Sequence, residues 1–204
     1  MPLTQALPFR AIRRIRQPDV EPVSLAEVKD ALGIAPEVAD DDAYLTGLIA
    51  AARIQAEEMI NGTLTLTRWQ AVAVRLGSCG CSGVEMPYPP FFVDDTHPVE
   101  VTYTTADGVS RVVDQSEIRV NVIELPGRLQ VRTPMYTGCC DSSAVVRWWA
   151  GVEKATDVPS PARTAIMRMV AGLYASRGDD PAAFIRDDPA TKGLLASIAW
   201  CGGC

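Results

Sequence analysis

The chain has 204 residues, of which 48% are hydrophobic and 22% are charged, with a formal net charge of −6. This composition is typical of a folded soluble chain and excludes wholesale disorder, and no apolar run approaches the roughly 20 residues of a membrane span. Residues 1–18 carry four arginines and no acid, whereas the remaining chain has 15 basic and 25 acidic residues. The average charge argues against a general nucleic-acid binder, but it conceals a basic N-terminal arm, residues 1–21, ahead of an acidic body.

Two helices are expected after the arm. Ser24 and Glu27 have the spacing of a capping box, which predicts a helix over 24–33 that ends at Gly33. A longer helix is predicted over 41–60, with an apolar stripe on one face. The three aspartates at 40–42 favour the N-terminus of this helix through its dipole, and they lack the spacing of a calcium loop.

Strands are expected in the middle of the chain. Residues 64–76 alternate between apolar and polar side chains, which predicts a half-buried strand. Asp107 and Gly108 favour a hairpin turn between two of the later strands. Further short strands are predicted at residues 84–87, 98–105, 109–114, 117–123, 128–132 and 143–150.

Helical periodicity returns from residue 159 to about 177, and Asp188-Pro189 predicts the start of a last short helix. This order predicts an α+β fold, in which N-terminal and C-terminal helices pack together around an inserted, mostly antiparallel β-region. The expected divisions are helical segments at 22–62 and 159–200, a β-region at 63–158 and a Cys-Gly-Gly-Cys tail at 201–204.

Residues with catalytic potential are sparse. The one histidine, His97, precedes a proline, which is typical of a loop residue rather than of a general base. The sequence contains no P-loop, no Gly-x-Ser-x-Gly elbow and no Gly-x-Gly-x-x-Gly motif. We therefore expect no enzyme activity and no cofactor.

The six cysteines fall in three close groups, Cys79-x-Cys81, Cys139-Cys140 and Cys201-x-x-Cys204. The last group has thioredoxin-like spacing, but it follows a helix and does not open one, so redox catalysis is not expected. The first two groups could hold zinc, although their spacings are shorter than in common zinc sites. A disulfide formed after cell exit is an equal alternative, and free thiols are the default expectation.

Several segments, taken in order, resemble the head–tail connector (adaptor) family of tailed bacteriophages. The opening segments are PVSLAEVK at 22–29, DDAYLTGLIAAAR at 41–53 and TLTRW at 65–69. The closing segments are VVRWWAG at 145–151 and the helix that follows Pro159. The same component occurs in gene transfer agents, which are domesticated phage-like particles.

The resemblance implies a structural protein of the virion neck, made in the bacterial cytoplasm and assembled at the head–tail junction. About twelve copies would form a ring beneath the portal protein, extend the channel for double-stranded DNA without binding it specifically, and dock a stopper or tail-completion protein. No membrane partner is expected. The candidate interface residues are Arg10, Arg13, Arg14 and Arg16 in the arm and Leu194, Leu195, Ile198 and Trp200 near the C-terminus.

Two other function classes remain open from the sequence. The first is a small zinc or redox protein that uses the cysteine groups, with Cys79, Cys81, Cys139 and Cys140 as ligands. The second is a DNA-binding packaging factor that uses the arginines of the basic arm.

Overall fold

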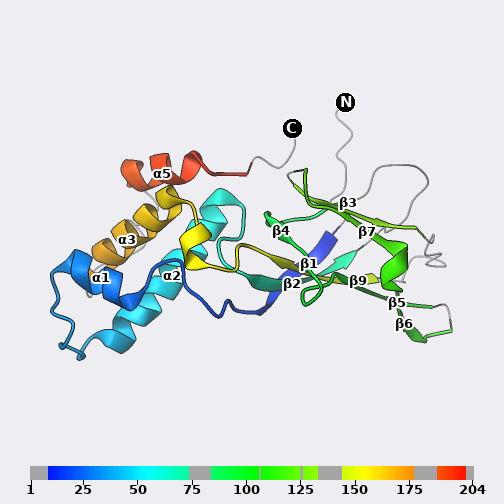
Figure 1. Ribbon diagram of the computed structural model, residues 1–204, viewed down its shortest axis with the longest axis horizontal. Helices are drawn as coiled ribbons and strands as arrows, with labels where there is room; N and C mark the ends of the chain where they lie inside the picture. Colours follow the sequence, from blue (N-terminus) through cyan, green and yellow to red (C-terminus); the bar gives the residue numbers. More distant parts are fainter. Residues whose placement is uncertain are drawn as a thin grey trace. The chain divides into compact units, whose positions relative to one another are not determined.

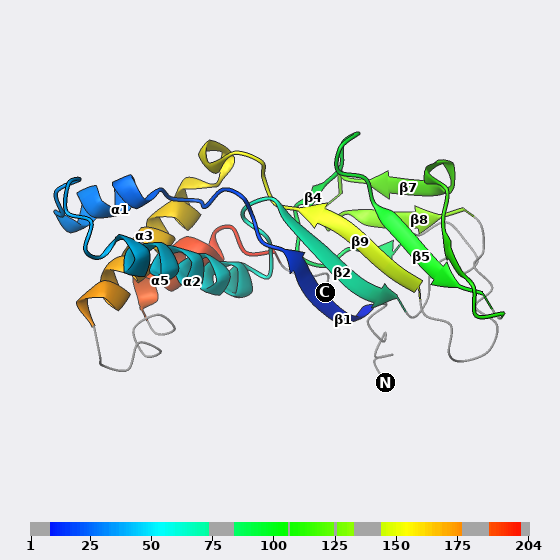
Figure 2. The ribbon, with the colours of Figure 1, turned by 90° about the horizontal axis from the view of Figure 1, so that it is seen from below.

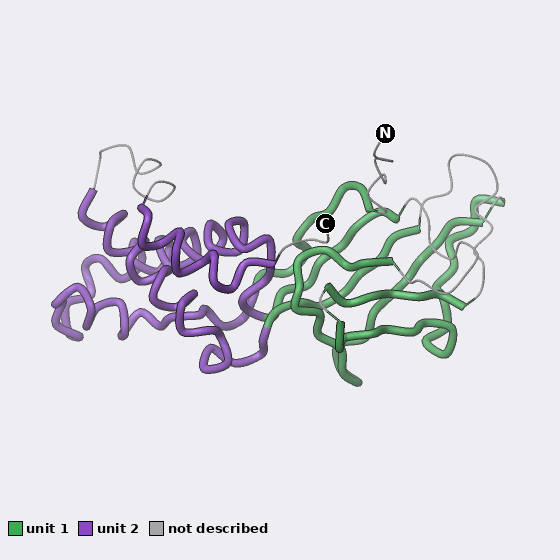
Figure 3. The backbone as a smooth tube through the Cα atoms, turned by 90° about the horizontal axis from the view of Figure 1, so that it is seen from above, with its two compact units in different colours: residues 1–17, 66–151 green, residues 18–65, 152–204 purple. Residues whose placement is uncertain are grey.

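The computed structural model describes residues 9–73, 84–105, 107–124, 126–132, 144–176 and 188–200. Apart from one N-terminal strand, helices lie at both ends of the described chain and strands in its middle, so the predicted α+β class is confirmed (Figure 1). The chain divides into two compact units (Figure 3). The first, residues 1–17 and 66–151, is the β-unit, and the second, residues 18–65 and 152–204, is the helical unit.

The β-unit contains two antiparallel sheets. The larger has the order β1-β2-β9-β5-β6, with β4 also paired to β9 (Figure 2). Its strands are β1 (Phe9–Arg16), β2 (Thr67–Ala73), β4 (Phe91–Phe92), β5 (Glu100–Thr104), β6 (Ser110–Val112) and β9 (Ala144–Ala150). The smaller sheet, ordered β3-β8-β7, consists of β3 (Val84–Glu85), β7 (Ile118–Asn121) and β8 (Arg128–Val131).

Side chains from both sheets share one apolar core. On β2, burial alternates strictly, with Trp69, Ala71 and Ala73 buried, which confirms the predicted alternation. The strand begins at Thr67, three residues later than predicted. Residues 74–76 of that prediction lie outside the described residues. Trp148 of β9 and Leu129 of β8 are both fully buried in this core.

The expected basic arm is partly a strand, because residues 9–16 form β1 and pair antiparallel with β2. The register shifts between Arg10 and Arg13 and again between Arg14 and Arg16. Ala11 has a φ of 49° at the first shift. Such bulges add residues to one strand and destroy its two-residue periodicity, which is why sequence alternation did not predict β1.

Turn chemistry sets other strand boundaries in this unit. Gly108 has a φ of 79° in the β5–β6 hairpin, where the Thr105 amide donates to the Val109 carbonyl at 2.9 Å, as the predicted turn requires. The strand predicted from 117 begins one residue later, at Ile118. Asp114 accepts the Ser116 amide at 2.8 Å and caps a 3-10 turn over Gln115–Glu117.

The helical unit contains four described helices, of which the first two follow the sequence prediction closely. They are α1 (Leu25–Leu32), α2 (Asp42–Ile60), α3 (Ser160–Ala175) and α5 (Pro189–Ala196), with a further 3-10 turn at Ala155–Asp157. The predicted capping box of α1 is present, because the Ser24 hydroxyl accepts the Glu27 amide and the Glu27 carboxylate accepts the Ser24 amide. Gly33 ends α1 in the left-handed region, as predicted.

Helices α2 and α3 pack on each other through small residues, and α1 and α5 complete the unit. Ala52 and Ala56 of α2 and Ala162 and Ala165 of α3 are all completely buried. Small side chains allow two helices to approach closely, so the packing of α2 on α3 through these alanines forms the centre of the helical unit. Among the described helices, none is both long and apolar enough to cross a membrane.

Candidate interaction surface

The β1 arginines are divided between two faces of the larger sheet. Arg10, Arg13 and Arg16 pair with Val72, Gln70 and Arg68 of β2. Residues paired directly across two strands lie on the same face, so these three arginines share the face opposite the core. The two bulges therefore give three-residue spacing on one face, where a regular strand would give two-residue spacing.

Arg14 lies on the other face, toward the core. It pairs with Trp69, and its guanidinium lies 4.8 Å from the centroid of the Trp69 ring. Trp69 in turn stacks on Tyr88 at 4.3 Å. Arg14 therefore belongs to the packing of the β-unit and does not lie on the same face as the other three arm arginines.

The outer face continues across β2, β9 and β5. Trp149 of β9 pairs with Arg68, and Arg147 pairs with both Gln70 and Glu100. The arginines of this continuous surface, which we call the arginine face, are Arg10, Arg13, Arg16, Arg68 and Arg147.

Trp149 is the aromatic centre of the arginine face. The guanidinium groups of Arg16 and Arg68 lie 5.5 and 5.6 Å from its ring centroid, within cation–π range. The His97 ring meets the same indole edge-on at 4.7 Å. These contacts leave Trp149 only 8% exposed although it points away from the core.

Glu100 is the acidic group in the middle of the arginine face. It accepts Arg68 Nη2 at 2.5 Å and lies 3.6 Å from Arg147 Nη1. Arg147 Nε also donates to Gln70 Oε1 at 3.0 Å. The inner arginines are therefore held by polar partners, whereas Arg10 and Arg13 are exposed on the edge strand.

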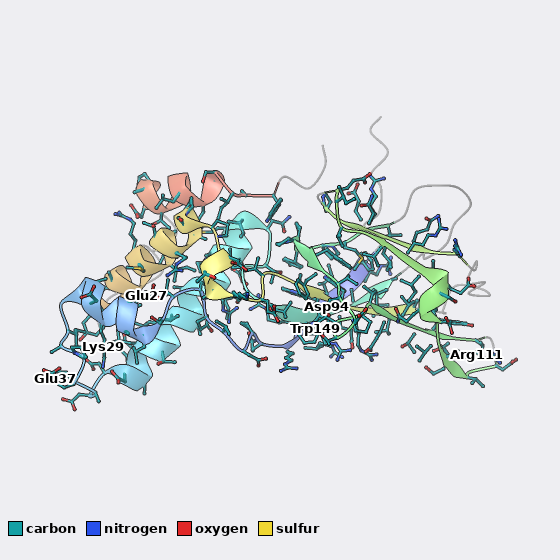
Figure 4. The ribbon with its side chains drawn as sticks, viewed as in Figure 1. Glu27, Lys29, Glu37, Asp94, Arg111 and Trp149 are labelled. Carbon is teal, nitrogen blue, oxygen red and sulfur yellow. The ribbon has the colours of Figure 1, made fainter. Side chains whose placement is uncertain are left out.

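His97 lies in the loop between β4 and β5, as predicted. Its Nδ1 lies 2.8 Å from Asp94 Oδ1, which also accepts the His97 amide at 2.6 Å. Figure 4 places Asp94 near Trp149. The pKa of Asp94 is lowered: desolvation raises it, but hydrogen bonds from Thr96 and His97 together outweigh that effect. The imidazole thus fixes this loop against the Trp149 side of the sheet.

The C-terminal candidates lie in the helical unit and differ in exposure. Leu195 is 1% exposed and belongs to the core of that unit, which corrects its assignment as an interface residue. Leu194 and Ile198 are half-buried against the same core. The Trp200 amide donates to the Ile60 carbonyl at 2.9 Å, which fastens the segment after α5 to the end of α2.

Two aspartates at the start of α2 bind other side chains. Asp41 stands at the N-cap position without a side-chain bond to the helix amides, and it accepts the Tyr174 hydroxyl at 2.7 Å. Asp42 lies 2.5 Å from Lys29 Nζ. Across the described ranges, no three His, Cys, Asp or Glu residues are grouped as a metal site would require. All six cysteines lie outside the described residues, and with them the residues of the zinc, disulfide and redox alternatives.

Sequence reasoning missed Arg68 and Arg147 as members of this surface. Both occupy outward positions of alternating strands, and both precede tryptophans. The alternation in each strand could have indicated that both side chains point away from the core. Only the pairing of β1, β2 and β9, which are more than 120 residues apart in the chain at their extremes, shows that they share a face with Arg10, Arg13 and Arg16.

Residues 22–84 match the model of the phage gp6-like head-tail connector protein family. This segment includes α1, α2 and β2. The predicted resemblance to a phage-like head–tail connector is confirmed. No curated protein sequence matches the chain.

Chains of solved structures share nearly the whole fold of this chain. A chain of the structure described as "Neck of empty GTA particle computed with C6 symmetry" aligns with a TM-score of 0.74 and 15% identity, over 96% of this chain and 98% of that one. A chain of "Virion of native gene transfer agent (GTA) particle" aligns at a TM-score of 0.72 and 15% identity, with the same coverage. A chain of "Neck of native GTA particle computed with C12 symmetry" aligns at 0.64 and 14%, again over 96% and 98%.

Proposed function

We propose that the chain is a structural subunit of the neck of a phage-like particle, where it connects head and tail. The observation that carries this proposal is the TM-score of 0.74 to a neck chain, with 96% of this chain and 98% of that chain covered. Both units are included in that coverage. The match of residues 22–84 to the connector family supports the same role from sequence.

In this role, about twelve copies form a ring beneath a portal protein and dock a stopper or tail-completion protein. A similar chain comes from a neck structure computed with C12 symmetry, which supports the copy number. A closed ring needs interfaces at which two different faces of one subunit meet. The two units, one helical and one built of sheets, provide such different faces.

We further propose that double-stranded DNA passes through the ring without specific binding and that the chain catalyses no reaction. A net charge of −6 disfavours tight phosphate contacts, which would hold DNA in place. The described polar clusters around Trp149 and before α2 are internally paired, as expected for groups that fix a fold.

The proposal is tested in particles released by the strain that encodes the chain. Particles are purified with and without the gene, and the wild-type neck is imaged by cryo-electron microscopy. We expect density for this fold at the head–tail junction, and DNA-filled heads without tails when the gene is deleted. Complementation with the wild-type gene is the control. Tailed, infective or gene-transferring particles that lack the protein would contradict the proposal.

A further inference from the structure

Formal charge is distributed unequally between the two units. The β-unit has 11 basic and 9 acidic residues, a net charge of +2, whereas the helical unit has 8 basic and 16 acidic residues, a net charge of −8. Residues 18–65 alone hold 2 basic and 10 acidic residues. The two units of one chain therefore carry net charges of opposite sign.

The positive surface is the outer edge of the arginine face. Arg10 and Arg13 are exposed on edge strand β1, beside the inner arginines that Glu100 and Gln70 hold. Ile15 on the same strand is 38% exposed. An edge with guanidinium groups and an exposed aliphatic side chain has the composition of an interface for an acidic protein surface.

The negative surface lies at the end of α1 and in the loop between α1 and α2. We call it the acidic loop and define it by Asp30 of α1 and by Glu37 and Asp40 of the loop. All three are exposed, and Figure 4 places Glu37 on this loop. The neighbouring cation does not neutralise it, because Lys29 is only 5% exposed and its ammonium binds Asp42 and the Pro36 carbonyl.

Two large apolar side chains accompany the acidic loop. Val38 is 44% exposed and Tyr44 is 43% exposed. Exposed apolar and aromatic side chains surrounded by charged groups are typical of a protein interface. In a loop that contacts only solvent, such exposed apolar side chains gain nothing from burial.

We infer that the arginine face of one copy docks on the acidic loop of a second copy. We assign a second copy as the occupant because every chain carries both surfaces. Each arginine face is therefore matched by one acidic loop of opposite charge. The two surfaces are different parts of the chain, so the contact is heterologous and can repeat from copy to copy. This inference deepens the proposed function, since it names a surface by which ring subunits would meet.

Double-stranded DNA is the competing occupant of the arginine face. DNA would use Arg10 and Arg13 but would be indifferent to, or repelled by, the acidic loop. Charge reversals on the two surfaces therefore separate the two occupants.

The experiment measures self-association of the purified full chain by sedimentation velocity, from micromolar to millimolar concentration, at about 50 mM and about 500 mM salt. One variant carries Arg10→Glu with Arg13→Glu, and the other carries Glu37→Lys with Asp40→Lys. Matched controls with the same charge change are Arg111→Glu with Arg119→Glu, and Glu58→Lys with Glu153→Lys, all at exposed positions outside the two surfaces. Circular dichroism checks that every variant is folded.

We expect the wild type to associate more tightly at low salt, and each reversal to weaken association at least about ten-fold. Mixing the two reversed variants restores association, because each reversed surface then meets an oppositely charged one. The controls keep wild-type association.

Three outcomes overturn the inference: a wild type that stays monomeric throughout, reversals without effect, or a loss that mixing does not restore. Binding of a duplex oligonucleotide that falls only with the arginine reversal would assign the face to DNA instead. The proposed function is judged separately by the presence of the chain in the particle neck, so either can fail while the other stands.

Discussion

Arg53 and Glu57, one turn apart on α2, form an ion pair of 3.0 Å in which both side chains are only 2% exposed. Arg53 Nε also binds Glu21 at 2.8 Å, and Glu57 Oε1 accepts the Leu64 amide at 2.9 Å. The pair therefore joins three segments of the helical unit: the approach to α1, the middle of α2 and the turn after α2.

Replacing Arg53 with Ala should destabilise the helical unit by about 3–5 kcal/mol, because the Glu57 carboxylate would stay buried without its charged partner. Urea unfolding followed by circular dichroism measures the change. The matched control is Arg128→Ala, which removes an arginine from the exposed pair with Glu85 and should cost less than about 1 kcal/mol. Equal effects of the two substitutions would show that burial of the pair is unimportant.

Phe9 anchors β1 to the β-unit, because it is 5% exposed and its ring lies 6.1 Å from that of Trp148. Phe9→Ala should cost about 3–5 kcal/mol through lost burial and the cavity left in the core. Ile15→Ala, at a 38% exposed position of the same strand, is the control and should cost much less. Thermal unfolding monitored by tryptophan fluorescence reports mainly the β-unit, which holds three of the four tryptophans. An unchanged midpoint for Phe9→Ala would mean that the stability of the unit does not depend on β1.

Local signals predicted the helical unit well. Each helix boundary that was predicted depends on a few neighbouring residues, so it can be recognised from sequence alone. The examples are the Ser24–Glu27 capping box, the left-handed Gly33 and the Asp188 N-cap. Leu195 was predicted as an interface residue but is buried in the helical unit. The spacing of apolar residues does not distinguish a side chain that packs in its own core from one that contacts a partner protein.

The arginine face depended on information that no local pattern contains. Arg13, Gln70 and Arg147 are neighbours across three strands, separated by 57 and 77 residues of chain. The bulges in β1 also removed the alternation that would have indicated a strand. The pairing of residues 9–16 with β2, which composition does not predict, shows that part of the expected arm is the edge strand of the larger sheet.

Two glycines should respond in opposite directions to the same substitution. Gly33 has a φ of 69° and Gly47 lies within α2, and an added Cβ would meet nothing within 4 Å at either position. Gly33→Ala should destabilise the helical unit by about 1 kcal/mol through backbone strain, whereas Gly47→Ala should stabilise it by about 0.5–1 kcal/mol. Chemical denaturation of both variants tests this, and equal signs would contradict the assigned C-cap of α1.

Asp188 gives the start of α5 a defined acid sensitivity. The Thr191 hydroxyl donates to its carboxylate at 2.5 Å and is the main cause of a pKa lowered from 3.8 to about 2, with Arg168 and the amides of Thr191 and Ala190 contributing. Because the folded pKa lies below the unfolded one, the ionised carboxylate stabilises the fold above about pH 4. This contribution should be lost as the pH falls from about 4 to about 2.

The test compares wild type with Asp188→Asn in thermal unfolding between about pH 6 and pH 2, followed by helical circular dichroism. Asparagine can still accept the helix amides but has no charge to titrate, so the wild type should be more stable at neutral pH and lose that advantage below about pH 4. Thr191→Val, which removes the hydroxyl donor, should raise the pKa of Asp188 and move the loss to higher pH. A wild-type advantage that persists unchanged to pH 2 would contradict this origin of the acid sensitivity.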